Sequence, residues 1–135
     1  MNKLVVSTLE GKIHVFDMRT NHVEAGYSSL EEKTSENSTI WGVSHLPQNR
    51  DIFGVQGGDG KLSLYKYKYP NQRVLKDAEG RDKGVVGSLE LLNDKTISKQ
   101  PIVSLDWHQD KLGLGVMASL DQTVKVVIVT KLNLF

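Results

Sequence analysis

The residues that could do chemistry are few and scattered along the chain. There are four histidines and no cysteine, which excludes disulfides, zinc-thiolate sites and thiol nucleophiles. His14, His22, His45 and His108 fit no metal-binding spacing. Asp106 and His108 fall on the same side of an extended strand, yet no serine nucleophile or oxyanion donor accompanies them. The sequence therefore predicts no catalytic residue, metal site or cofactor.

Two further stretches look like ligand-binding motifs. Residues 54–62 (GVQGGDGKL) are rich in glycine, but Leu62 follows Lys61 where a phosphate-binding loop needs Ser or Thr. Residues 65–69 (YKYKY) alternate aromatic and basic side chains, as a base-stacking surface would. In a strand, however, all three tyrosines share one face, which favours packing between neighbouring layers. A net charge of +1 gives no support for binding nucleic acid.

The chain is of ordinary globular composition. It has 135 residues, of which 39% are hydrophobic and 24% charged, enough for one domain with a core. No apolar run approaches the length of a membrane span, and the N-terminal residues do not form a signal peptide. We expect a cytoplasmic protein that binds neither membranes nor nucleic acid.

The elements that must position these residues are mostly strands. Three segments consist of an alternating apolar run, a tight polar turn and a second run: residues 4–18, 52–67 and 114–129. They align without gaps on Gly11, Gly60 and Gln122, and Asp59-Gly60 indicates a type I′ hairpin turn. Further strands are expected at residues 22–28, 39–47, 87–92 and 101–107. The charged stretch 71–84 reads as a mobile loop.

The predicted fold is all-β, and the strands are arranged in repeated units of up to four strands each. Such a repeat is typical of a β-propeller, whose blades are four-stranded antiparallel sheets. The sequence predicts about two and a half to three blades: an incomplete blade at 1–37, a blade at 38–99 with a long insertion at 71–99, and a C-terminal blade at 100–135. Since propellers have more blades than this, we expect a longer chain or self-association to supply the rest.

The hairpins resemble those of the WD-repeat family. The matching repeat positions are Gly11, Phe16, Asp17, Asp59, Gly60, Tyr65, Ser119 and Asp121. Tyr65-Lys66 and Val127-Ile128 replace the Trp-Asp pair of the repeat, and no Gly-His dipeptide precedes the strands at 39–47 and 101–107. The buried His-Ser-Asp-Trp network of that repeat is therefore expected to be incomplete, which should make each blade less rigid.

Several longer stretches are similar to the C-terminal half of the Monad-like WD-repeat proteins, which are implicated in dynein arm assembly. They are HLPQNRDIF, YKYKYP, KDAEG, QPIVSLDW and SLDQTVKVVIVTKLNLF. This resemblance implies a non-enzymatic scaffold that serves a prefoldin-like and RuvB-like co-chaperone assembly, helps dynein heavy chains mature, and has a proposed role in apoptosis. Its expected partners are proteins.

The candidate partner contacts lie in charged loops: Arg50, Asp51, Arg73, Lys76, Asp77, Glu79, Arg81 and Asp82. Loops held by a rigid scaffold are the usual place for such contacts. Two alternatives stay open. One is a WD-repeat scaffold for unrelated partners. The other is a small-molecule site in a propeller channel, for which Ser44, His45, Ser104 and Asp106 are the available side chains.

Overall fold

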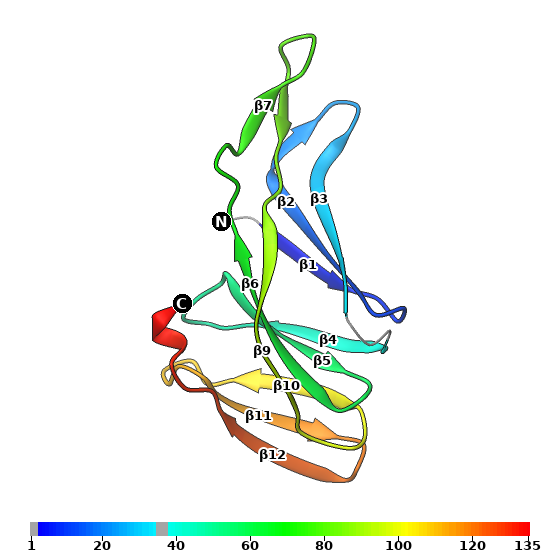
Figure 1. Ribbon diagram of the computed structural model, residues 1–135, viewed down its shortest axis with the longest axis vertical. Coiled ribbons are helices and arrows are strands. Elements are labelled where there is room, and N and C mark those ends of the chain that lie inside the picture. Colours follow the sequence, from blue (N-terminus) through cyan, green and yellow to red (C-terminus); the bar gives the residue numbers. More distant parts are fainter. Residues whose placement is uncertain (1–2, 35–37) are drawn as a thin grey trace.

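The computed structural model describes residues 3–34 and 38–135 of the chain (Figure 1). Within these ranges the chain forms strands, one short 3₁₀ helix and no α-helix. The elements are β1 (Lys3–Ser7), β2 (Lys12–His22), β3 (Gly26–Lys33), β4 (Ile40–His45), β5 (Ile52–Gly57), β6 (Lys61–Lys68), β7 (Val74–Lys76), β8 (Asp82–Gly84), β9 (Ser88–Thr96), β10 (Ile102–Trp107), β11 (Leu114–Ser119), β12 (Thr123–Ile128) and η1 (Leu132–Leu134).

The strands form three antiparallel sheets and a separate hairpin. The N-terminal sheet has the order β1-β2-β3, the central sheet β4-β5-β6-β9, and the C-terminal sheet β10-β11-β12. The central sheet lies between the other two (Figure 1). The prediction of an all-β chain is confirmed, and the strands are grouped in the expected order. The expected boundary between residues 37 and 38 falls at the edge of the described ranges.

Two segments differ from the sequence prediction. The expected strand at 22–28 is instead the end of β2, a turn and the start of β3, because a bulge between Asp17 and Asn21 lengthens β2 by three unpaired residues. The stretch 71–84, expected to be a loop, contains the β7–β8 hairpin. The remaining part of the 71–99 insertion includes β9, the fourth strand of the central sheet.

The three aligned turns share one backbone conformation. Gly11, Gly60 and Gln122 all have positive φ, at 77°, 80° and 67°. Each of these residues donates its N–H to the carbonyl oxygen three residues earlier, at 3.2 Å. The predicted type I′ turn is wrong, because Asp59 does not have a positive φ. A turn closed by one left-handed residue fits the observed geometry, and it explains why Gln122 can stand where the other turns have glycine.

The core consists of two apolar clusters, one on each face of the central sheet. Leu62 and Leu64 of β6 join Ile102, Trp107 and Met117 in the cluster against the C-terminal sheet. On the opposite face of β6, Tyr65 and Tyr67 pack with Ile13, Val15 and Phe53. The tyrosines of the YKYKY stretch are therefore packing residues, as the alternation predicted, and the central sheet is buried on both faces along β5 and β6.

Polar contacts fix the central sheet to the C-terminal sheet. The Ser44 hydroxyl donates to the Leu105 carbonyl oxygen (3.1 Å), and the Trp107 indole N–H donates to the Ser44 carbonyl oxygen (3.3 Å). At the other end of β10 and β11, the Ser119 hydroxyl donates to Ser98, which donates to the Asp121 carboxylate, both at 2.8 Å. This chain of hydroxyls links the segment after β9 to the β11–β12 turn.

The outer faces of the two end sheets carry exposed apolar side chains. On the C-terminal sheet these are Val116, Val124, Val126 and Ile128, of which the last three are each about 70% exposed. Leu4 and Val6 are exposed on the N-terminal sheet. A sheet face of this composition is normally covered by a neighbouring layer.

The close packing of the Gly60 turn predicts a steric cost. A Cβ at Gly60 would lie 1.9 Å from the Ser98 carbonyl oxygen, whereas a Cβ at Gly80, which also has a positive φ, would meet nothing within 4 Å. Gly60→Ala should therefore lower the free energy of unfolding by about 2–4 kcal/mol, and Gly80→Ala by about 1 kcal/mol. Denaturant unfolding measures both, and equal losses would contradict the clash.

Candidate functional site

Six of the eight candidate contact residues lie in the insertion, in or beside the β7–β8 hairpin. The hairpin pairs Val74 with Gly84 and Lys76 with Asp82, and residues 77–81 form its tip. It projects away from the central sheet next to β2 and β3 (Figure 1). Gly84 is buried there, against Thr20 and Ser28. The β7–β8 hairpin is therefore an ordered arm that rests on the N-terminal sheet.

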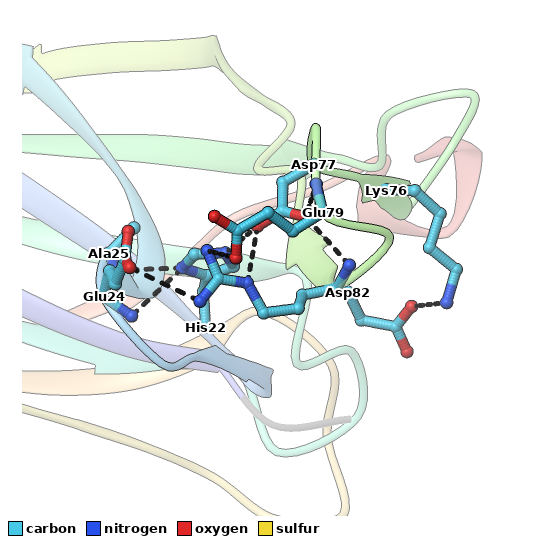
Figure 2. A network of polar contacts seen from close by, with 8 residues as sticks. His22, Glu24, Ala25, Lys76, Asp77, Glu79 and Asp82 are labelled. Atoms are coloured by element: carbon cyan, nitrogen blue, oxygen red, sulfur yellow. Dashed lines mark hydrogen bonds and ion pairs between the residues drawn. The ribbon is translucent and has the colours of Figure 1, made fainter.

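The side chain of Asp77 organises the tip of the hairpin. One carboxylate oxygen, Oδ1, accepts the backbone N–H groups of Glu79 (2.9 Å) and Arg81 (2.8 Å). The other, Oδ2, accepts hydrogen bonds from His22 Nε2 and Arg81 Nε, both at 2.9 Å (Figure 2). An aspartate that closes its own turn in this way is common. Here the same carboxylate also accepts a hydrogen bond from His22 of β2, in the neighbouring N-terminal sheet.

The hydrogen bonds of His22 settle which ring nitrogen carries the proton. Its Nδ1 atom accepts the backbone N–H groups of Glu24 (3.2 Å) and Ala25 (3.0 Å), so Nδ1 must be unprotonated. The proton is therefore on Nε2, and this N–H donates a hydrogen bond to the Asp77 carboxylate. His22 is buried and stabilises the β2–β3 turn and the docked hairpin at the same time (Figure 2).

Three further charged side chains of the hairpin, those of Lys76, Glu79 and Asp82, are paired within the chain. Arg81 contacts Glu24 of the β2–β3 turn at 3.4 Å and Glu79 at 3.0 Å. Lys76 pairs with Asp82 across the two strands (Figure 2). Glu79, Lys76 and Asp82 are each more than half exposed. These three side chains form the outward surface, whereas Asp77 and Arg81 hold the hairpin in place.

The environment of Asp77 favours its charged form. The hydrogen bond from His22 and those from Arg81 hold the pKa of its carboxyl well below the usual range. Docking of the hairpin therefore depends on an ionised Asp77.

A second polar cluster joins β1, the β4–β5 turn and the end of β6. The Asp51 carboxylate accepts hydrogen bonds from Lys3 Nζ (2.6 Å) and from the Tyr69 hydroxyl (2.9 Å). The Lys3 ammonium also lies 4.5 Å from the centre of the Tyr67 ring, and the Arg73 guanidinium lies 4.7 Å from that of Tyr69. Burial and the bond to Asp51 raise the pKa of Tyr69 to about 12.

The structure thus divides the eight candidate contacts into two groups. Four have structural contacts in these clusters: Asp51, Arg73, Asp77 and Arg81. Four project from the surface: Arg50, Lys76, Glu79 and Asp82. His22 and Tyr69 were missed by the sequence analysis. The spacing of Asp77 and Gly80 is a turn signature that could have indicated the hairpin tip, but nothing local links it to His22.

The side chains of the alternative channel site do not meet around a cavity. Ser44 donates its hydroxyl to Leu105, whereas Ser104 and Asp106 lie on the exposed face of β10. Among the described residues, no group of three or more His, Asp or Glu side chains could hold a metal ion. No helix in the same part of the chain is both long and apolar enough to cross a membrane.

Comparison with known proteins gives one consistent result. The chain is 60% identical to dynein axonemal assembly factor 10 of Xenopus laevis, 59% identical to that of Homo sapiens and 53% identical to that of Chlamydomonas reinhardtii. Each alignment covers 133 residues, which is 98% of this chain. The chain is a close homologue of dynein axonemal assembly factor 10. The expected resemblance to the Monad-like proteins is confirmed.

The similarity to assembly factor 10 covers a limited part of those proteins. The chain spans 37% of the length of each of these relatives. No protein-family profile matches the chain. The relatives are named as assembly factors, not as enzymes.

Loss of the Asp77 carboxylate should release the hairpin. In Asp77→Asn one acceptor oxygen becomes an amide donor that faces the donors of His22 and Arg81, so two hydrogen bonds are lost. Trypsin should then cleave after Lys76, Arg81 and Lys83 several times faster than in the wild type. Asp82→Asn is the matched control, because Asp82 contributes only an exposed pair with Lys76. Equal cleavage of the two variants would contradict the assigned role.

The lowered pKa of Asp77 also predicts a pH dependence. The carboxylate stabilises the folded state fully above the pKa of an unfolded aspartate, about 4, and this contribution is lost as the pH falls toward the lower folded pKa. The difference in unfolding free energy between the wild type and Asp77→Asn should therefore be present at about pH 5 and shrink below about pH 4. Denaturant titrations at fixed ionic strength test this, and a difference that persists unchanged in acid would refute it.

Proposed function

We propose that the chain is a non-enzymatic protein-interaction scaffold that acts in the assembly of axonemal dyneins in the cytoplasm. The observation that carries this proposal is the identity of 53–60% with dynein axonemal assembly factor 10 over 98% of the chain. Each alignment spans 133 residues of the chain, so the sheets and the β7–β8 hairpin both lie in the aligned region. The proposed partners are the prefoldin-like and RuvB-like co-chaperone assembly and the dynein heavy chains.

The proposed architecture is part of a WD-repeat β-propeller. The three sheets would be its blades, with boundaries at 1–37, 38–99 and 100–135. The shared turn geometry and the burial of both faces of the central sheet support this proposal, since each blade of a propeller packs between two others. The exposed valines of β12 fit a blade whose outer face receives a further sheet. The additional length of the relatives is the proposed source of further blades.

The proposed mechanism is display of an ordered arm by a rigid sheet layer. The β7–β8 hairpin presents Lys76, Glu79 and Asp82 at a fixed position, because Asp77 and His22 dock it on the N-terminal sheet. A pre-ordered arm loses little conformational entropy when a partner binds. The charges at the tip, rather than a flexible loop, would then select the partner.

A charge exchange tests the hairpin without removing it. The double substitution Lys76→Glu with Asp82→Lys retains the cross-strand pair but reverses the charges that the arm displays. In flagellated cells that lack the assembly factor, the protein carrying this exchange should restore less axonemal dynein than the wild-type protein. Quantification of dynein heavy chains in isolated axonemes measures the effect.

The matched control exchanges another exposed cross-strand pair. Lys68 of β6 and Glu90 of β9 are 2.8 Å apart and similarly exposed, but lie outside the arm. Lys68→Glu with Glu90→Lys should restore axonemal dynein fully. Full restoration by the arm exchange would reject the arm as a contact surface, and failure of the wild-type protein would reject the proposed function itself.

A further inference from the structure

A hollow of about 300 Å³ lies between the start of β1 and the β4–β5 turn. It is lined by Lys3, His45, Leu46, Pro47 and Arg50. His45, Pro47 and Arg50 are exposed, so the hollow opens to solvent. Three of the five lining residues are basic, and none is acidic. A hollow of this size has room for one anionic side chain with several waters, because a water takes about 30 Å³ in the liquid.

Lys3 is held in place before any ligand arrives. Its side chain is only 5% exposed, and its ammonium lies against the Tyr67 and Tyr69 rings, at 4.5 and 5.2 Å from their centres. Asp51 is the acid at hydrogen-bonding distance from this ammonium, at 2.6 Å, and its Oδ1 atom also binds the Tyr69 hydroxyl. Asp51 therefore anchors Lys3 from behind and does not line the hollow.

Arg50 and His45 differ from Lys3, the third basic residue that lines the hollow. No hydrogen bond or ion pair to either side chain is present within residues 3–34 and 38–135, whereas Lys3 is paired with Asp51. The His45 ring lies tilted against the Phe53 ring, with ring centres 5.6 Å apart. The guanidinium of Arg50 can donate hydrogen bonds to a carboxylate, and the imidazole of His45 can take up a proton beside it. Together they form a surface complementary to a carboxylate.

We propose that this hollow binds an acidic side chain from an extended segment of a protein partner. Arg50 donates to the ligand's carboxylate from the rim, Lys3 supplies positive charge from the floor, and Leu46 and Pro47 pack against its methylene groups. The chain's net charge of +1 and its mixed surface charges provide no broad positive field for a polyanion, whereas a single lined hollow suits one carboxylate. This inference rests on the proposed function, because it requires a protein partner.

The charge on His45 should be coupled to binding. Partial desolvation of the ring, together with the charges of Lys3 and Arg50, lowers the pKa of His45. These two cations are the charged groups that face the ring, from β1 and from the β4–β5 turn, and Asp51 lies beyond Lys3. A bound carboxylate favours the protonated ring, so binding takes up a proton and must strengthen as the pH falls.

Binding of a fluorescein-labelled hexaglutamate peptide to the full chain tests the proposal. The peptide should bind more tightly than hexaglutamine, and added salt should weaken it. Arg50→Gln should reduce the affinity about fivefold, Arg50→Lys should retain most of it, and Lys83→Gln should leave it unchanged. Lys83 is the matched control because it is exposed on β8, away from the hollow. Thermal unfolding verifies that each variant is folded.

The pH profile separates a ligand contact from a general charge effect. Affinity for hexaglutamate should rise from about pH 8 to about pH 6, and His45→Gln should flatten this rise. Equal binding of hexaglutamine, no effect of Arg50→Gln, or binding of inorganic phosphate without binding of the peptide would each overturn the proposal. The proposed function and the proposed binding site are tested independently. Binding of hexaglutamate can be measured without dynein, and restoration of axonemal dynein by the wild-type protein can be measured without reference to the hollow.

Discussion

The structure depends on the fact that both faces of the central sheet are buried. β6 directs Leu62 and Leu64 to one neighbouring sheet and Tyr65 and Tyr67 to the other. The change from leucine to tyrosine coincides with a register shift against β9 between Leu64 and Tyr65. Because alternate side chains of β6 pack into different layers, the sheets cannot slide relative to one another without loss of apolar burial.

This constraint also determines where polar groups can lie. Tyr67 is almost completely buried, and its hydroxyl accepts the backbone N–H of Gly87 at 2.8 Å. The chain returns from the hairpin to β9 at this point, and a Cβ at Gly87 would lie only 1.8 Å from the Lys68 carbonyl oxygen. A buried tyrosine of the core therefore fixes the base of the arm, while Asp77 and His22 fix its tip.

The sequence predicted those features that are encoded locally. Alternating apolar residues and tight-turn signatures located the three repeated hairpins and the strand order, and they separated the two faces of β6. The arm was not predicted, because β7 and β8 have three residues each and show no alternation. Its docking depends on a contact between His22 and Asp77, which are 55 residues apart. The bulge in β2 was also missed: Asp17 accepts the backbone N–H of Arg19 there and binds its guanidinium, a geometry that alternation does not reveal.

The basic hollow and the charged arm share one supporting cluster. Lys3 forms the floor of the hollow and also binds Asp51, which binds the Tyr69 hydroxyl. Arg73, directly before β7, lies over the Tyr69 ring. The floor of the hollow and the base of the arm are therefore connected through direct contacts from Lys3 to Asp51, Tyr69 and Arg73. A substitution at Asp51 would remove partners from both Lys3 and Tyr69, so it would disturb the support of both surfaces.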